Sequence, residues 1–199
     1  MSEILVFNKW PSEGIVVADP GLERYITVKP VIVPKTGARY AGNKFYKSKI
    51  TIVERLINRM MTPGHRAKKH KLTSGLTTGK SATVYNLVYQ ALAIIERKTK
   101  KNPIEVLVKA VENAAPREEI ITIEYGGARY PKAVECSPQR RVDQVLKLFV
   151  QTTYQKTFNS KKGAANALAE EIIAAYQASP TSAAITKKLE VERQADGSR

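Results

Sequence analysis

Apolar stripes with the spacing of an α-helix limit what this chain can fold into. Apolar residues recur every three or four positions in five stretches, and at this spacing they share one side of a helix. The five stretches cover residues 52–60, 84–95, 104–111, 142–150 and 165–176. A sixth stretch, 182–196, is charged and offers only Ile185 and Leu189 as an apolar seam. The linkers differ in length and composition, which is typical of helical hairpins rather than a repeat array. We therefore predict a mainly α fold, a bundle of about six helices.

Helix-start signals support two of these helices. Asn-Pro-Ile-Glu at residues 102–105 places a capping side chain before a proline at the first helical position and a glutamate at the third. Ser-Pro at residues 137–138 repeats the cap and the proline before the fourth helix. In the first helix, Arg55 and Arg59 are expected to lie away from the apolar side.

One β-rich stretch lies between the third and fourth predicted helices. Residues 120–125 and 128–134 flank Gly126-Gly127, and glycine permits the positive φ angles of a tight hairpin turn. Pro131 is tolerated there because both strands of a two-stranded ribbon are edges. We predict a protruding β-hairpin at about 117–136. Since an isolated ribbon is marginally stable in water, we expect it to lie against a partner.

The N-terminal segment has a different character. Residues 1–34 carry a net charge of −1, and their β-branched runs at 15–17 and 25–28 are interrupted by prolines. Such runs suit either short strands or an extended arm packed on a core. We divide the chain into an N-terminal arm, residues 1–49 and basic from residue 35, and a helical domain, residues 50–199.

Charge indicates the class of partner. Between Lys35 and Lys80 the chain has twelve Lys or Arg residues and one acidic residue, Glu54, so this stretch supplies +11 of the formal net charge of +15. Such one-sided charge repels itself unless an anionic partner lies against it, which predicts nucleic acid or an anionic membrane. The aromatic residues of the stretch do not form the face of an amphipathic helix, which favours nucleic acid.

These cations form two groups. One precedes the first predicted helix and is interleaved with Tyr40, Phe45 and Tyr46, and the other lies in the loop after that helix with His65 and His70. Cations neutralise phosphates, and aromatic rings stack on bases or sugars. The alternative is a solvated basic loop with its aromatic residues in the core. The candidate phosphate-binding residues are Lys35, Arg39, Lys44, Lys47, Lys49, Arg66, Lys68, Lys69 and Lys71.

Composition argues against several other classes. No stretch approaches the roughly 18 apolar residues of a membrane-spanning helix, and the N-terminus lacks the features of a signal peptide. Cys136 is the single cysteine, so no internal disulfide can form, which fits a reducing cytosolic compartment. His65 and His70 have no second cysteine or acidic cluster beside them, so we interpret them as loop residues and expect no metal site. No catalytic constellation is visible, and no cofactor is expected.

Arg140 and Arg141 stand in the first turn of the fourth predicted helix, where the helix dipole disfavours cations by roughly 0.3–1 kcal/mol. Two explanations remain open. A phosphate at the helix start would be held by both side chains and by free backbone N–H groups. Alternatively, the arginines form ion pairs with Glu118, Glu119 or Glu135.

Residues 75–81, Gly-Leu-Thr-Thr-Gly-Lys-Ser, come close to a P-loop. Three residues instead of four separate the first glycine from Gly-Lys, and a polar loop rather than a buried strand precedes the motif. We therefore prefer a loop that ends in a helix start at Lys80 or Ser81. A divergent P-loop nucleotidase that uses Lys80 is kept as an alternative.

Several motifs in a fixed order resemble the S-seven family of small-subunit ribosomal proteins. They are Asn-Pro-Ile-Glu-Val-Leu-Val-Lys-Ala-Val-Glu-Asn at 102–113, Pro-Arg-Glu at 116–118, Gly-Gly-Ala at 126–128 and Ser-Pro-Gln-Arg-Arg at 137–141. Residues 52–61 and Gly-Lys at 79–80 extend the resemblance to about residues 50–199.

Other features indicate which branch of the family the chain resembles. Lys-Trp-Pro at 9–11 and Gly-Ala-Arg-Tyr-Ala at 37–41 are similar to the archaeal and eukaryotic branch, and residues 65–78 look inserted relative to the bacterial one. The many lysines and the single cysteine favour an archaeal member.

The resemblance implies an RNA-binding protein of the ribosome, located in the cytoplasm. Such a protein binds the 3′ major (head) domain of small-subunit rRNA, nucleates head assembly, touches neighbouring small-subunit proteins and lies near mRNA and tRNA at the exit site. No membrane contact and no homo-oligomer are expected. Residues 50–199 would be the RNA-binding domain. The alternative is a free-standing tRNA- or DNA-binding helical protein.

The resemblance also extends the set of candidate site residues. Further rRNA-binding candidates are Lys80, Arg117, Arg140 and Arg141. The candidates for the exit-site hairpin are Gly126, Gly127, Arg129, Tyr130 and Lys132.

Overall fold

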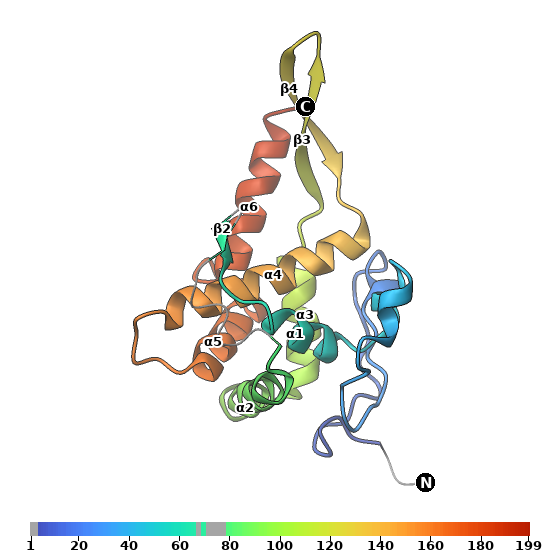
Figure 1. Ribbon diagram of the computed structural model, residues 1–199, viewed down its shortest axis with the longest axis vertical. Helices are drawn as coiled ribbons and strands as arrows, with labels where there is room; N and C mark the ends of the chain where they lie inside the picture. Colours follow the sequence, from blue (N-terminus) through green and yellow to red (C-terminus); the bar gives the residue numbers. More distant parts are fainter. Residues whose placement is uncertain (1–3, 67–68, 71–78) are drawn as a thin grey trace.

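The computed structural model describes residues 4–66, 69–70 and 79–199, and these residues contain six α-helices and two short antiparallel ladders (Figure 1). The helices are α1 (Ile52–Met60), α2 (Ser81–Thr99), α3 (Pro103–Ala114), α4 (Pro138–Thr157), α5 (Ala164–Tyr176) and α6 (Ala183–Asp196). The predicted mainly helical fold is confirmed. Ser81 is the first residue of α2 and Lys80 precedes it, as the sequence predicts.

The core forms around α5, which packs against α2, α3 and α4. Each helix turns its apolar stripe inward, because burying apolar surface contributes roughly 25 cal/mol per Å². The largest fully buried side chains include those of Phe149, Leu92, Leu107, Leu168 and Ile172. The hydrophobic spacing of the sequence therefore decides which side of each helix faces the core.

The two predicted helix starts differ in their capping. The Asn102 side chain accepts a hydrogen bond from the Ile104 N–H at 3.0 Å, and Pro103 is the first residue of α3. Ser137 precedes α4 and Pro138 is its first residue, but the Ser137 side chain makes no capping hydrogen bond. The position of the second cap is thus confirmed, and its hydrogen bond is not formed.

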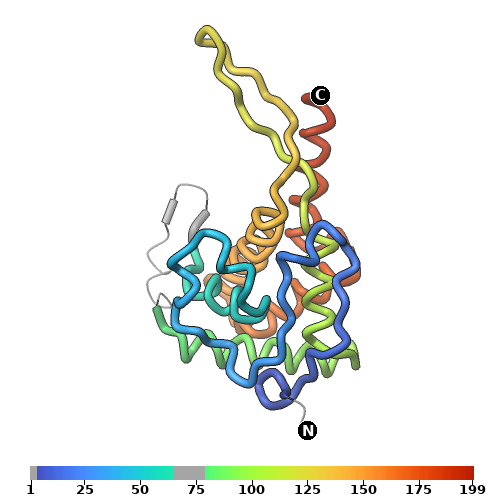
Figure 2. Tube along the Cα trace, turned by 90° about the vertical axis from the view of Figure 1, so that its right-hand side faces the viewer, coloured from blue at the N-terminus to red at the C-terminus, as the bar shows by residue number. Residues whose placement is uncertain are grey.

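A β-hairpin of β3 (Glu118–Tyr125) and β4 (Ala128–Glu135) protrudes from the helices between α3 and α4, as predicted (Figure 2). Gly126 and Gly127 form the turn with φ angles of +58° and +81°. Two positive φ angles in a two-residue turn match the right-handed twist of the strands. The C-terminal helix α6 packs along β3, so the last residues of the chain lie beside the base of the hairpin (Figure 1).

The N-terminal segment is an arm of turns rather than a set of strands. Its described residues contain the short 3₁₀ helices η1 (Glu23–Tyr25), η2 (Arg39–Gly42) and η3 (Tyr46–Lys49), and the runs at 15–17 and 25–28 form no ladder. Thr27 makes only an isolated parallel bridge to Thr51. Of the two alternatives, the packed arm is the one observed: Val6, Trp10, Leu22 and Ile26 belong to the same buried cluster as the helices.

Arg55 is only 5% exposed, because the arm covers the side of α1 that lies away from the apolar stripe. Two sequence predictions about individual residues are wrong. Leu189 is 52% exposed, and the seam of α6 is formed instead by Ala184, Ile185 and Ala195.

The second correction concerns the two histidines. His65 and His70 are not loop residues, since they pair in a ladder of β1 (His65–Arg66) and β2 (Lys69–His70). Pairing of only two residues on each side is too short to produce a recognisable alternating pattern in the sequence.

Candidate nucleic-acid interface

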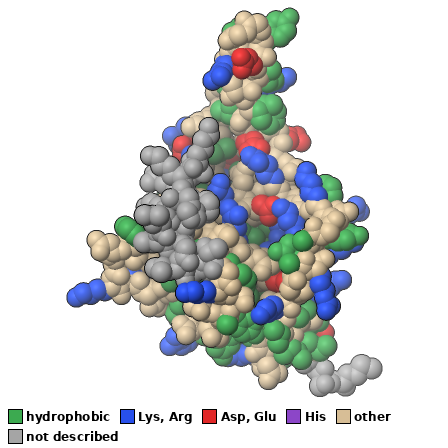
Figure 3. All heavy atoms as spheres, viewed as in Figure 1, with side chains coloured by type: hydrophobic (Ala, Val, Ile, Leu, Met, Phe, Trp, Pro, Cys, Tyr) green, Lys and Arg blue, Asp and Glu red, His purple; other side chains and the backbone are tan. Residues whose placement is uncertain are grey.

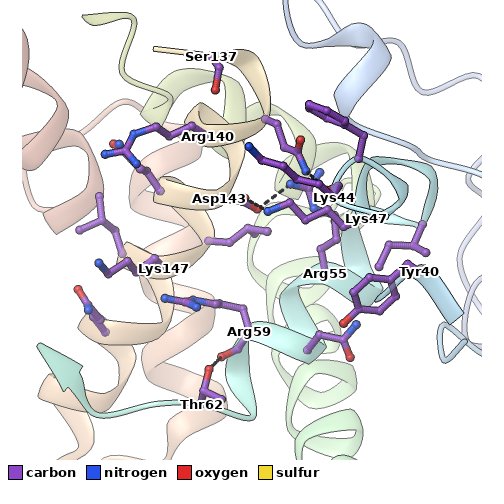
Figure 4. Close-up of a pocket in the computed structure, with 18 of the residues that line it drawn as sticks. Tyr40, Lys44, Lys47, Arg55, Arg59, Thr62, Ser137, Arg140, Asp143 and Lys147 are labelled. Carbon is purple, nitrogen blue, oxygen red and sulfur yellow. Dashed lines mark hydrogen bonds and ion pairs between the residues drawn. The ribbon is translucent and has the colours of Figure 1, made fainter. Parts of the chain in front are cut away.

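A groove of about 980 Å³ opens between the arm, α1, α4 and α6 (Figure 4). Among the described residues that line it, seven are Lys or Arg and one, Asp143, is acidic. The seven cations are Lys44, Lys47, Arg55, Arg59, Arg140, Lys147 and Lys187. Figure 3 shows Lys and Arg side chains gathered around a hollow below the hairpin. A concave surface lined mainly by cations concentrates the electrostatic potential and attracts polyanions.

Helix α4 forms one wall of the groove through a polar stripe. Arg140, Gln144, Lys147 and Gln151 all line the groove, and their spacing of three or four residues places them on one side of the helix. Its other side carries buried residues such as Phe149. The amphipathic pattern that packs α4 on the core therefore also aligns its cations toward the groove.

The arm forms the opposite wall with Tyr40, Lys44, Phe45 and Lys47. Phe45 is 58% exposed and Tyr46 is also exposed, so for these two rings the alternative of burial in the core is wrong. The Lys49 ammonium lies 4.5 Å from the centre of the Tyr46 ring. Exposed rings beside cations are the arrangement with which proteins stack on bases while holding phosphates.

Arg140 lies at the hairpin end of the groove and is paired with Glu119 of β3. Its Nε lies 2.6 Å from Glu119 Oε1, and its Nη2 donates to Oε2 at 2.8 Å. Gln144 donates to the same carboxylate at 3.1 Å. The predicted ion pair is thus present for Arg140. Because the side chain remains exposed, it can also approach a phosphate.

Arg141 has different surroundings, although it is the next residue. It is only 8% exposed, its Nη2 donates to Asp19 Oδ2 at 2.8 Å, and its Nε donates to the Pro116 carbonyl at 3.1 Å. Burial opposes ionisation of Asp19, but the hydrogen bond from Arg141, the hydrogen bond from the Gly21 N–H and the positive charges of Arg141 and Arg117 together lower the pKa of Asp19. Arg141 therefore holds the arm against α4, and its partner is none of the three glutamates that the sequence suggests.

Five further candidate residues do not line the groove. Lys35, Arg39 and Lys49 are exposed on the arm, Lys80 is exposed before α2, and Arg117 is exposed at the base of the hairpin. Arg66 and Lys69 pair in the β1–β2 ladder, whereas Lys68 and Lys71 lie outside the described residues. The structure thus brings together Lys44, Lys47 and Arg140 from the predicted set.

The hairpin candidates are exposed. Arg129 lies opposite Glu124 at 3.6 Å, and Tyr130 pairs in register with Ile123. Directly paired residues share one face of a ribbon, so Ile121, Ile123, Tyr125 and Tyr130 form an exposed apolar face that continues to Lys132, the partner of Ile121.

Sequence reasoning missed Arg55, Arg59, Lys147 and Lys187 as groove residues. The signal that could have found Lys147 is the polar stripe of α4, which repeats opposite its apolar stripe. Arg59 and Lys187 become neighbours of this stripe only through the packing of α1 and α6 against α4.

Neither a metal-ion site nor a membrane-spanning helix is present in residues 4–66, 69–70 and 79–199. Within these ranges, no group of three or more His, Cys, Asp or Glu side chains is placed to hold a metal ion. Within the same ranges, no helix is both long and apolar enough to cross a membrane.

The family model of ribosomal protein S7p/S5e matches residues 22–199. The small ribosomal subunit protein uS7 of Nanoarchaeum equitans (strain Kin4-M) is 50% identical over 194 residues, 98% of this chain and 98% of that protein. The proteins of the same name from Archaeoglobus fulgidus and Methanothrix thermoacetophila are 46% identical over 197 residues and 42% identical over 194. These matches cover 99% and 98% of this chain, and 96% and 99% of the two relatives.

The similarity therefore includes most of the arm and is wider than the motifs at 50–199 indicate. Matches to three archaeal relatives also agree with the archaeal character of the sequence. On the family match and these identities, the chain belongs to the ribosomal protein S7p/S5e family.

Proposed function

We propose that this chain is a structural protein of the small ribosomal subunit that binds the 3′ major domain of its rRNA and nucleates assembly of the head. The observation that carries the proposal is the groove between the arm, α1, α4 and α6, where seven cations surround one carboxylate. Family membership indicates the ribosome as the setting. The groove supplies the surface on which rRNA would lie.

The groove is suited to the sugar–phosphate backbone of a folded RNA. Lys44, Lys147 and Lys187 come from three separate segments and would contact phosphates along its length. Arg59 lies in the last turn of α1, where the helix dipole favours a cation. The exposed rings of Phe45 and Tyr46 would stack on unpaired bases at the rim.

The remaining predicted cations would extend this surface. Lys35, Arg39 and Lys49 lie on the same arm as the groove wall, and Arg117 and Arg140 lie at the base of the hairpin. Arg141 is the weakest of the candidates for a direct contact, because its guanidinium is buried against Asp19. Its proposed contribution is to hold the arm in the shape that RNA meets.

We also propose that the hairpin lies near mRNA and tRNA at the exit site. Three observations support this: it protrudes beyond the helices, both strands are edges, and its exposed residues include Arg129, Tyr130 and Lys132 (Figure 1). The apolar face with Tyr125 and Tyr130 suits contact with a neighbouring ribosomal component rather than with water.

Family membership also bears on the alternatives. The relatives are ribosomal proteins and not enzymes, so the chain is not an enzyme and a nucleotidase based on Lys80 is set aside. A free-standing tRNA or DNA binder would remain near the top of a sucrose gradient of cell extract. We expect this chain to sediment with the small subunit.

Charge reversal tests whether the groove binds RNA. The variant Lys44→Glu/Lys147→Glu removes one cation from each wall of the groove. Each lost phosphate contact should flatten the plot of log affinity against log salt by about one unit. We expect the affinity for a transcript of the 3′ major domain to fall more than about tenfold near 0.15 M salt.

The matched control reverses the same number of charges elsewhere. Lys100→Glu/Lys161→Glu changes two exposed lysines that do not line the groove. It should weaken binding less than about threefold, through net charge alone. Equal losses in the two variants would show that the groove is not the binding surface, and no binding by the wild-type protein would refute the RNA-binding function.

A further inference from the structure

A carboxylate in a groove that binds RNA needs an explanation, because it repels phosphates. Asp143 is the one acidic residue among the described residues that line the groove. Its Oδ1 accepts a hydrogen bond from Arg55 Nη2 at 2.9 Å, and its Oδ2 forms an ion pair with Lys47 Nζ (Figure 4). One carboxylate on α4 thus links the helix α1 to the arm.

The ion pair between Asp143 and Arg55 neutralises a guanidinium that RNA could not fully contact. The guanidinium is almost entirely shielded from solvent, and its Nη1 donates to the Tyr25 carbonyl at 2.7 Å. A buried cation without a counterion is strongly destabilising. Asp143 therefore allows Arg55 to remain between α1, α4 and the arm, where it holds the backbone of the arm at Tyr25.

The Lys47 pair acts together with Gln139, which lies one helical turn before Asp143 on α4. Gln139 Nε2 donates to the Lys44 carbonyl at 3.0 Å. The two side chains therefore attach both ends of residues 44–47 to α4. This short segment supplies Lys44, Phe45 and Lys47 to the groove. It has little regular structure of its own, since the 3₁₀ helix η3 begins only at Tyr46 and ends at Lys49.

We propose that Asp143 and Gln139 are positioning residues that hold the basic turn of the arm, residues 44–50, in its RNA-binding conformation before RNA arrives. The proposal rests on the RNA-binding function proposed above. A turn that is already ordered does not have to lose conformational freedom when it binds, which strengthens binding. The negative charge of Asp143 is then compatible with an RNA site, because its two partners already neutralise it.

The variant Asp143→Asn distinguishes the effect of positioning on RNA affinity from the effect of net charge. It keeps the shape of the side chain and raises the net charge by one, so electrostatics alone predicts tighter binding to any RNA. Positioning predicts the opposite for the specific target. We expect about tenfold weaker binding to a transcript of the 3′ major domain, and equal or tighter binding to poly(U), which needs no fixed arrangement of contacts.

The variant Gln139→Ala makes the same test without changing charge and leaves the Arg55 pair intact. It should weaken binding to the transcript by about threefold and leave binding to poly(U) unchanged. In both variants the backbone amides of residues 44–50 should exchange hydrogen faster in the free protein, whereas those of α5 should not. If Asp143→Asn does not fold, Gln139→Ala decides the question.

Two results would overturn the proposal: transcript binding by Asp143→Asn that equals or exceeds the wild type, or unchanged hydrogen exchange at residues 44–50 in a folded variant. A separate result would contradict the proposed function and not this positioning role. If the wild-type protein does not prefer the transcript to poly(U), specific rRNA binding fails, while hydrogen exchange in the free protein still decides whether these two residues position the turn.

Discussion

Neighbouring residues at the start of α4 have opposite surroundings. Arg140 is exposed and lines the groove, whereas Arg141 is buried against Asp19 of the arm. Successive residues of a helix point about 100° apart, so one faces the groove while the next faces the packed arm. A motif with two arginines therefore combines a candidate RNA contact with a contact that holds the fold together.

Cys136 provides a test of a single side chain, because it is the only cysteine of the chain. Burial, followed by the negative charge of Glu119, raises the pKa of its thiol from 9.0 to about 11. At pH 8 the reactive thiolate should therefore be about a hundredfold scarcer than in the unfolded chain. We expect iodoacetamide to alkylate Cys136 at least about a hundredfold more slowly in native protein than in urea, measured by mass spectrometry.

The rate at which iodoacetamide alkylates Cys136 should rise with pH. Between pH 7 and 10 the native rate should rise about tenfold per pH unit, since the thiolate fraction grows in that proportion below the pKa. In urea the rate should level off above about pH 9, where more than half of the unfolded thiol is ionised. Similar rates for native and unfolded protein at pH 8 would contradict the burial of this thiol at the end of β4.

Among the elements, the β3–β4 hairpin depends most on its turn. Gly126 and Gly127 both have positive φ angles, and an L-residue in that region costs about 1–2 kcal/mol. The variant Gly126→Ala/Gly127→Ala should therefore open the tip of the hairpin. Faster hydrogen exchange at the backbone amides of residues 123–130 would show this opening. The thermal midpoint of the whole protein should change little, since the residues of the hairpin from 121 to 132 are exposed.

The control for this change is Gly42→Ala. Gly42 does not have a positive φ, and an added Cβ would meet no atom within 4 Å. It should leave exchange at the tip and the thermal midpoint unchanged. A large drop of the midpoint in the hairpin variant would mean that the hairpin contributes to the core, contrary to its exposure.

For the molecule as a whole, the arm and the helices share one core. Trp10 is 2% exposed and its ring lies 5.4 Å from that of Tyr89 on α2. Two buried carboxylates of the helices also hold the arm: Glu112 accepts from the Ala18 N–H at 2.5 Å and Glu54 from the Thr36 N–H at 2.8 Å. We infer that the arm and the helices unfold together.

Trp10 is the single tryptophan of the chain, so its fluorescence reports on the packing of the arm against the helices. In urea, the fluorescence transition should coincide with the loss of helical circular dichroism at 222 nm. Trp10→Ala should lower the free energy of unfolding by about 3–5 kcal/mol. If fluorescence changes at a clearly lower urea concentration, the arm is a separate unit and the boundary at residue 49 marks an independent domain.

Features that depend on residues close together in the chain could be predicted from the sequence, and features that depend on distant residues could not. The six helices, the Asn102 cap and the glycine turn depend on residues close in sequence, and all were predicted. The path of the arm was not, because it is set by contacts with residues 18 to 122 positions away, such as Thr36 with Glu54 and Asp19 with Arg141. The burial of Arg55 follows from that path.

The candidate site divides in the same way. The sequence by itself determined a helical class, a hairpin and an excess of cations with aromatic neighbours, since spacing and charge are local properties. Only the tertiary structure decided that Lys44, Arg59, Lys147 and Lys187 line one groove, that Asp143 lies among them and that Arg141 does not. The physical reason is that a groove between four segments exists only after apolar packing has brought them together, and packing energy depends on surfaces far apart in the chain.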